Sequence, residues 1–195
     1  MEAKLLELGI NKENIISIFW ERLIRGVNSR TSEYHTFTFA YQVADHAAPR
    51  IGTMVLREVE PTYNRLFFHA DNRSPKIQFI HQQPVGLLFY SRKDKLQFKL
   101  TGKAYCHIKD SVTNERWESM LDMSKRCYQQ NKAPGEAIEM SERLHTLTKQ
   151  QAYNNFCVVT VVIESIDMMY LEALNNQRFI VTYLADEVCI EQVAP

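Results

Sequence analysis

The stretch KLQFKLTGKAYCHI, residues 95–108, carries the clearest structural signal in the chain. Leu, Phe, Leu, Gly, Ala, Cys and Ile occupy every second position, while lysine and other polar or amphipathic residues fill the positions between. A period of two residues is typical of a β-strand with one face on a core and the other face towards solvent. The pattern predicts a long strand that points Gln97 away from the core.

The rest of the chain predicts more strands than helices. Alternating or short apolar runs predict strands at residues 34–43, 50–59, 64–70, 85–90, 156–166, 168–173, 178–184 and 188–193. Helical spacing predicts helices at residues 11–27, from Ser74 to about residue 83, at 113–130 and at 140–153. Because these helices do not alternate one for one with the strands, we expect an α+β, mainly β domain: an antiparallel barrel with peripheral helices over its openings.

Composition narrows the class of protein. The 195 residues are 45% hydrophobic and 24% charged, which predicts one domain over residues 1–195. The 23 basic and 23 acidic side chains cancel, which argues against a nucleic-acid partner, although the basic segment 92–103 alone would suit one. No apolar run approaches the ~20 residues of a membrane span, and the N-terminal residues lack the features of a secretory signal. We expect a cytoplasmic protein with no membrane partner.

No motif identifies a catalytic or metal-binding group. The four cysteines, Cys106, Cys127, Cys157 and Cys189, are spread singly without a CxxC pair, so the sequence indicates neither a metal site nor a disulfide framework. Nucleophile elbows, P-loops, GxGxxG and HExxH motifs do not occur. The catalytic residues, if any, stay unknown at this point.

Residues 72–76, Asn-Arg-Ser-Pro-Lys, are the best candidate for an anion site. Serine is a preferred helix N-cap and proline is favoured at the first helical position, so a helix is predicted to start at Ser74. Backbone N–H groups at a helix start attract anions, and Lys76 lies in the first turn, so the two residues form a phosphate cradle that Arg57 could clamp. The alternative is an ordinary capped surface helix with solvated arginines.

Five stretches resemble one family in order and in spacing. They are TMVLRE (53–58), LFFHADNRSPK (66–76), HQQPVGLLFY (81–90), LQFKLTGKA (96–104) and Arg178-Phe179 with the ending IEQVAP. Together they resemble the FMN-binding split barrels related to pyridoxamine 5'-phosphate oxidase. The resemblance implies an antiparallel split β-barrel, FMN as cofactor, and a homodimer with the flavin at the subunit interface.

The resemblance also implies which residues bind the cofactor. They are Arg50, Thr53, Met54, Val55, Arg57, His69, Ala70, Ser74, Lys76, Gln97 and Arg178. In this assignment Ser74 and Lys76 hold the phosphate, Gln97 meets the edge of the isoalloxazine, and Arg178 approaches from the partner subunit.

The function implied is that of an FMN-dependent oxidoreductase with an unidentified small-molecule substrate. A non-catalytic flavin- or haem-binding module is the alternative. Gly52, Ala70 and Pro75 stand where the family commonly has Arg, Thr and Arg, and the Arg-x-His that grips the substrate of the true oxidase is not found before Arg178. Trp117 and Pro134-Gly135 resemble shorter relatives. We therefore expect such a relative and not the oxidase itself.

Overall fold

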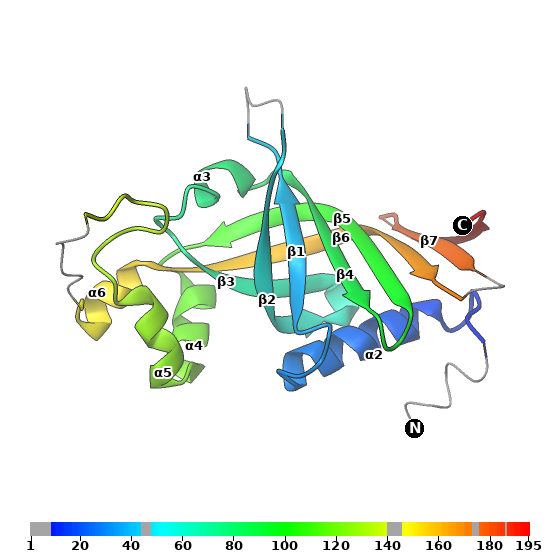
Figure 1. The fold of residues 1–195 in the computed structure, drawn as a ribbon, viewed down its shortest axis with the longest axis horizontal. Helices are drawn as coiled ribbons and strands as arrows, with labels where there is room; N and C mark the ends of the chain where they lie inside the picture. The colour runs from blue at the N-terminus through cyan, green and yellow to red at the C-terminus, as the bar shows by residue number, and fades with distance from the viewer. Residues whose placement is uncertain (1–8, 44–47, 140–145, 173–175, 186) are drawn as a thin grey trace.

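The computed structural model describes residues 9–43, 48–139, 146–172, 176–185 and 187–195. Its strands are β1 (Thr36–Tyr41), β2 (Arg50–Glu60), β3 (Arg65–Asp71), β4 (Pro84–Ser91), β5 (Leu96–His107), β6 (Phe156–Tyr170), β7 (Gln177–Tyr183) and β8 (Val188–Val193). All pair antiparallel in the order β3-β2-β1-β4-β5-β6-β7-β8, and β3 also pairs with β6. This extra pairing closes the strands from β3 to β6 into a barrel (Figure 1). The predicted fold class, a mainly β split barrel with peripheral helices, is confirmed.

β6 is the strand that joins the barrel to the rest of the sheet. Residues 156–162 pair with β3, whereas residues 165–170 pair with β7. The sequence predicts two strands here, 156–166 and 168–173, and that division is wrong, because the strand runs unbroken to Tyr170. Asp167 does not end it, since its carboxylate accepts two hydrogen bonds from Arg178 on the neighbouring strand. Residue 173 lies outside the described ranges.

The barrel interior is filled by aromatic and aliphatic side chains of the strands. Phe39, Phe68, Phe89 and Phe98 are all fully buried there. Helix α2 (Ile15–Asn28) packs against this core, with the Phe19 ring edge-on to Phe98 at 5.2 Å between centroids. The predicted N-terminal helix is confirmed, although it begins at Ile15 and not at residue 11. Figure 1 shows α2 lying across one end of the barrel.

A buried cluster of charges fastens α2 to the turn between β4 and β5. The Asp94 carboxylate lies 2.8 Å from Arg22 Nε and 2.5 Å from Arg25 Nη2. The Tyr34 hydroxyl donates a hydrogen bond of 3.1 Å to the same carboxylate. Arg22 is 2% exposed and Asp94 8%, so these charges are paired away from water. We call Arg22, Arg25, Tyr34 and Asp94 the Asp94 cluster.

The other helices form a second layer on the outer face of β3 and β6 (Figure 1). They are α4 (Ser111–Ser119), α5 (Asp122–Lys125), the 3-10 turn η2 (Arg126–Tyr128) and α6 (Lys149–Asn154). A separate hydrophobic cluster holds them to the sheet, and Trp117 packs there against Phe156 at 5.3 Å between ring centroids. The remaining short elements are η1 (Pro61–Tyr63) and α3 (Ile77–Ile80).

Two helix predictions are wrong in this layer. The helix predicted over residues 113–130 is broken, because Met120 and Leu121 adopt extended backbone between α4 and α5. Leu121 and Met123 are exposed, so the apolar stripe that suggested one helix does not continue on a buried face. The helix predicted over 140–153 begins only at Lys149, and residues 140–145 lie outside the described ranges.

Over the described ranges, no helix is long and apolar enough to cross a membrane.

Candidate functional site

The Ser74–Lys76 segment lies in the turn between β3 and α3. Ser74 is buried, and the Lys76 ammonium donates a hydrogen bond of 2.9 Å to its hydroxyl oxygen. The predicted helix start at Ser74 is wrong, since α3 covers only Ile77–Ile80 and Lys76 is its N-cap. The Ser74 carbonyl accepts the Ile77 N–H in a tight turn instead. The phosphate cradle therefore rests on a hydroxyl and an ammonium group side by side, and not on a helix end.

A cavity of about 660 Å³ opens beside this segment. Five of the residues predicted to bind the cofactor line it: Arg50, Thr53, Met54, Ser74 and Lys76. Tyr41 and Phe79 also line it, and the sequence analysis missed both of them, because only the fold brings them to this place. Pro134 and Gly135 close another side.

Among the described residues, no acidic side chain neutralises the positive charge at this cavity. Asp71, the acidic group that influences Lys76, is bound by Arg73 through hydrogen bonds of 3.0 and 2.7 Å. Across the described part of the chain, no carboxylate lies within 4.0 Å of the Lys76 ammonium or of the Arg50 guanidinium. Burial lowers the pKa of Lys76, while the Asp71 charge opposes that shift. A half-buried ammonium without an acid partner is a good receptor for an anion.

Arg57, His69, Val55 and Ala70 lie further along β2 and β3. The register of these strands shifts between Leu56 and Glu58, which leaves Arg57 unpaired at a bulge. His69 packs edge-on against Phe156 at 4.9 Å between ring centroids. Burial, together with the charges of Arg57 and Arg116, lowers the pKa of His69 to about 3, so its imidazole is neutral at physiological pH.

One residue near His69 and one near Arg57 escaped the sequence analysis. Arg116 of α4 donates hydrogen bonds of 2.9 and 3.1 Å to the Glu58 carboxylate and contributes to the low pKa of His69. Tyr128 of η2 is buried, which raises the pKa of its phenol, while Arg57 opposes that shift. Both residues come from the helical layer, and no local pattern in the sequence links them to β3.

Gln97 and Arg178 stand apart from the cavity. Each lies directly opposite Met169 on β6, from β5 and β7 respectively, so the two side chains share one face of the sheet. Ser74 lies near the other end of β6, since Asp71 pairs with Phe156. In Figure 1, α3 and β7 accordingly lie in different parts of the molecule. One protomer therefore does not bring Gln97 and Arg178 together with Ser74 and Lys76.

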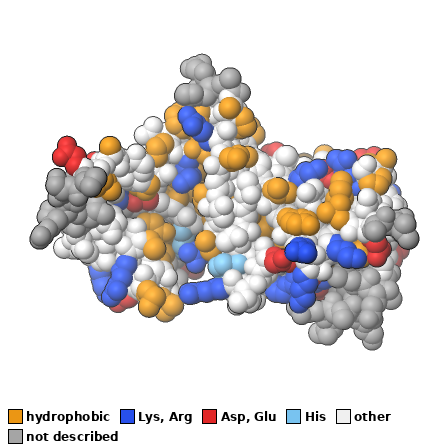
Figure 2. Space-filling model, in the orientation of Figure 1, with side chains coloured by type: hydrophobic (Ala, Val, Ile, Leu, Met, Phe, Trp, Pro, Cys, Tyr) orange, Lys and Arg blue, Asp and Glu red, His pale blue; other side chains and the backbone are white. Residues whose placement is uncertain are grey.

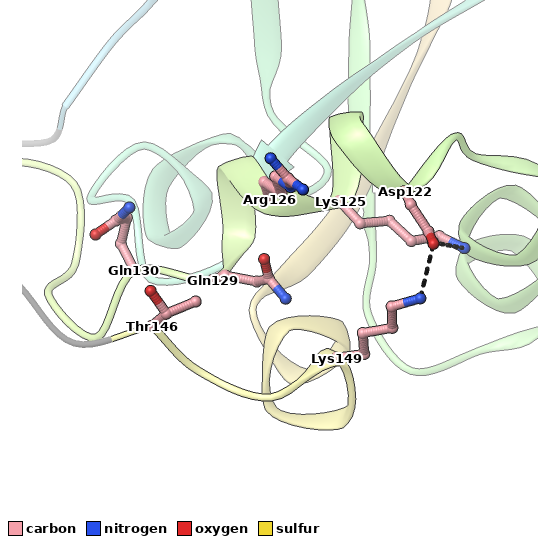
Figure 3. A pocket seen from close by; sticks show the side chains of 7 residues that line it. All are labelled: Asp122, Lys125, Arg126, Gln129, Gln130, Thr146 and Lys149. Carbon is pink, nitrogen blue, oxygen red and sulfur yellow. Dashed lines mark hydrogen bonds and ion pairs between the residues drawn. The ribbon is translucent and has the colours of Figure 1, made fainter.

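A further pocket of about 510 Å³ lies between α5, η2 and α6 (Figure 3). It contains three basic residues, Lys125, Arg126 and Lys149, but none of the predicted cofactor residues. Figure 3 shows Lys125 and Lys149 converging on Asp122, at 3.9 and 2.8 Å. Two of its three cations are thus paired within the protein. Over the face drawn in Figure 2, basic and hydrophobic side chains are interspersed.

The described residues hold no group of three or more His, Cys, Asp or Glu side chains that could bind a metal ion. The four cysteines are free thiols.

Comparisons with known proteins agree with this architecture. Residues 17–108 match the family model described as "Pyridoxamine 5'-phosphate oxidase, FMN-binding domain". Among solved structures, a pyridoxamine 5'-phosphate oxidase-related, FMN binding protein from Nostoc punctiforme PCC 73102 is 19% identical with a TM-score of 0.73, over 92% of this chain and 96% of that chain. A search of curated proteins found no match.

Two further structures show the same fold at lower identity. PhzG from Burkholderia lata 383, solved in complex with tetrahydrophenazine-1-carboxylic acid, is 12% identical with a TM-score of 0.71 over 92% of both chains. A protein related to general stress protein 26 from Clostridium acetobutylicum is 10% identical with a TM-score of 0.55, over 87% of this chain and 96% of that chain. At such identities the likeness establishes the fold alone.

Proposed function

Residues 17–108 belong to the pyridoxamine 5'-phosphate oxidase FMN-binding domain family, and on this premise we propose that the protein binds FMN and acts as an FMN-dependent oxidoreductase on a small molecule. The observation that carries the proposal is the half-buried Lys76 ammonium, which faces a cavity beside the Ser74 hydroxyl and has no acid partner among the described residues. A phosphate monoester supplies the missing negative charge.

The residues at the cavity fit the phosphate end of FMN. The Ser74 hydroxyl and the Lys76 ammonium each provide donors, and Arg50, which also lines the cavity, adds a second cation with no acid partner among the described residues. Because Lys76 is partly removed from water, an anion bound there regains interaction that the ammonium lost on folding. These groups would hold the phosphate against the turn between β3 and α3.

Arg57 and His69 fit the polar edge of the ring system. FMN, when bound, supplies the hydride acceptor of the reaction. The guanidinium of Arg57 is exposed at its bulge and can donate to carbonyl oxygens, while the neutral imidazole of His69 offers a hydrogen bond without adding charge. Val55 and Ala70 would provide the neighbouring apolar and backbone contacts.

We propose that Gln97 and Arg178 act across the interface of a homodimer. Their distance from Ser74 within one protomer supports a role at the partner's cavity. The outward faces of β2 and β4 also carry exposed apolar side chains, Ile51, Leu88 and Tyr90, which a second copy would cover. The single domain over residues 1–195 and the cytoplasmic location stay predictions.

Binding of FMN to the purified chain tests the first part of the proposal. Titration followed by quenching of flavin fluorescence is expected to show saturable binding, and Lys76→Met should raise the Kd at least tenfold, about the contribution of one charge-assisted phosphate contact. Lys149→Met is the matched control, because that exposed lysine pairs with Asp122 in another pocket. Equal affinity in the two variants would contradict the phosphate assignment.

Turnover tests the second part. The FMN-loaded protein is mixed anaerobically with nicotinamide dinucleotides and with candidate pyridine and phenazine substrates, and bleaching of the flavin absorbance is followed. Reduction by any of them supports the oxidoreductase. Tight FMN binding without reduction by any donor would favour the non-catalytic module.

A further inference from the structure

The cavity at Ser74 is larger than a phosphate group alone requires. Its volume of about 660 Å³ falls in the range of pockets that hold a whole drug-sized ligand. Two aromatic side chains, Tyr41 and Phe79, line it together with Arg50 and Lys76. The phosphate of FMN leaves these two rings without a role in recognition.

The strand register places the turn at Ser74 beside the middle of β2. Phe68 of β3 lies opposite Leu56 of β2 in an antiparallel pair, so the end of β3 at Asp71 comes level with Thr53. The turn at Ser74 follows directly, and Thr53 lines the same cavity. Thr53 therefore marks the point of β2 nearest to the proposed phosphate.

Arg50 and Arg57 lie in opposite directions from this point. Arg57, proposed at the polar edge of the flavin ring, lies four residues after Thr53, and Arg50 lies three residues before it. A strand rises about 3.3 Å per residue, so Arg50 lies about 10 Å past Thr53 on the side away from the ring. The cavity thus continues beyond the phosphate of FMN.

Two pairs of a cation and an aromatic ring line this part of the cavity. The Phe79 N–H donates to the Lys76 carbonyl at 3.0 Å, so the two side chains lie one helical turn apart on the same side. Tyr41 lies directly opposite Arg50 in the pair of β1 and β2, so these side chains share one face of the sheet. The Tyr41 ring is held against Phe39, at 5.9 Å between centroids.

We propose that the cofactor bound at Ser74 is the dinucleotide FAD. This inference rests on the proposed function, because the FMN half of FAD takes the place proposed for FMN. Lys76 and Arg50 each meet one phosphate of the diphosphate, and the adenine base lies against Tyr41 and Phe79. A base that stacks on an aromatic side chain gains affinity, so the second half of the dinucleotide tightens binding.

Calorimetric titration of the whole, flavin-free chain with FMN and with FAD tests the inference. FAD is expected to bind at least fivefold more tightly than FMN, which is the lower end of the contribution of one base–aromatic contact. Phe79→Leu and Tyr41→Leu each remove one ring and should each lower this preference at least twofold. The Kd for FMN should change less than twofold in both variants, which also shows that they are folded.

Tyr63→Leu is the matched control, because Tyr63 is exposed and does not line the cavity, and it should keep the full preference for FAD. Equal Kd values for FAD and FMN in the wild type, or a preference that neither ring variant lowers, would overturn the inference and leave the proposed function standing. AMP that binds the FMN-loaded chain while FAD binds no better than FMN would assign the two rings to a separate nucleotide and also overturn it. Binding of neither flavin would overturn the proposed function and this inference together.

Discussion

The Asp94 cluster and the Ser74–Lys76 turn both take charged groups out of water, but they leave them in opposite conditions. At Asp94 two guanidinium groups and a phenol converge on one carboxylate, so every charge has a partner inside the protein. At Ser74 the ammonium of Lys76 meets, within the described part of the chain, only a hydroxyl, and the nearby acid is held by Arg73. A buried charge that is paired supports the fold, whereas one that faces a cavity unpaired marks a place for a ligand.

The largest expected effect on the free energy of unfolding comes from removing the charge of Asp94, the carboxylate at the centre of the Asp94 cluster. Asp94→Asn leaves the buried Arg22 and the partly buried Arg25 without their carboxylate and should lower the free energy of unfolding by about 3–5 kcal/mol, measured by urea denaturation at pH 7. Asp167→Asn is the control, since its carboxylate bridges Lys99 and Arg178 near the surface and should cost about 1 kcal/mol or less. Similar losses of unfolding free energy in the two variants would show that the buried Asp94 cluster contributes no more than an ion pair near the surface.

The next effect concerns His69, which burial, together with the charges of Arg57 and Arg116, keeps neutral. The unfolded chain takes up a proton on this residue below pH 6.5, whereas the folded chain does so only near pH 3, so the folded state loses stability as the pH falls through this window. Between pH 7.5 and 4.5 the wild type should lose about 2–3 kcal/mol more than His69→Gln. Urea titrations at both pH values measure the difference, and a gap that does not change with pH would contradict this assignment.

A smaller effect isolates one bond of the Asp94 cluster. Tyr34→Phe removes the hydroxyl that donates to Asp94 and should lower the free energy of unfolding by about 1 kcal/mol. The same change at the exposed Tyr63 should have no measurable effect. Thermal unfolding followed by circular dichroism compares the two variants, and an unchanged midpoint for Tyr34→Phe would show that the two arginines alone satisfy the carboxylate.

The smallest effect has the opposite sign. Lys76→Met removes an ammonium whose burial is not compensated, so in a buffer without phosphate the variant should be as stable as the wild type or more stable by about 0.5 kcal/mol. Addition of FMN should then stabilise the wild type and leave the variant nearly unchanged. Differential scanning calorimetry with and without FMN measures both values. A clear loss of stability in the variant alone would place Lys76 with the structural charges.

The sequence predicts those parts of the fold in which burial repeats with a fixed period. The alternation around Phe98 and Leu100 defines β5, and the stripe of Ile15, Phe19 and Leu23 defines α2. Prediction from the sequence fails where a contact with a residue distant in the chain decides the local structure. The charge of Asp167 suggests a strand end, yet Arg178 on the next strand keeps that charge inside β6. Met120 and Leu121 continue an apolar spacing, but both adopt extended backbone and Leu121 is exposed.

The candidate site likewise contains residues that a local motif predicts and residues that only the fold brings together. Ser74 and Lys76 are close in sequence, so their adjacency follows from a local motif, even though the motif forms a turn and not a helix start. Arg116 reaches His69, and Tyr128 reaches Phe156, only because the helical layer folds back onto β3 and β6. The roles of the cofactor residues remain predictions. Because Gln97 and Arg178 lie far from Ser74 in one protomer, their predicted roles require a second subunit.

β6 pairs along one edge with β5 throughout, but along the other edge it changes partner near Ile163, from β3 to β7. Successive amides of a strand point to opposite edges, so native-state hydrogen exchange sorts those of β6 into distinct groups. Amides bonded to β5 exchange only when the whole barrel unfolds. The amides that face β7, such as those of Ile166 and Met168, belong to a C-terminal ribbon that can separate while the barrel stays closed. Deuterium uptake at Ile166 and Met168 would therefore rise well before that at Val159 and Val161.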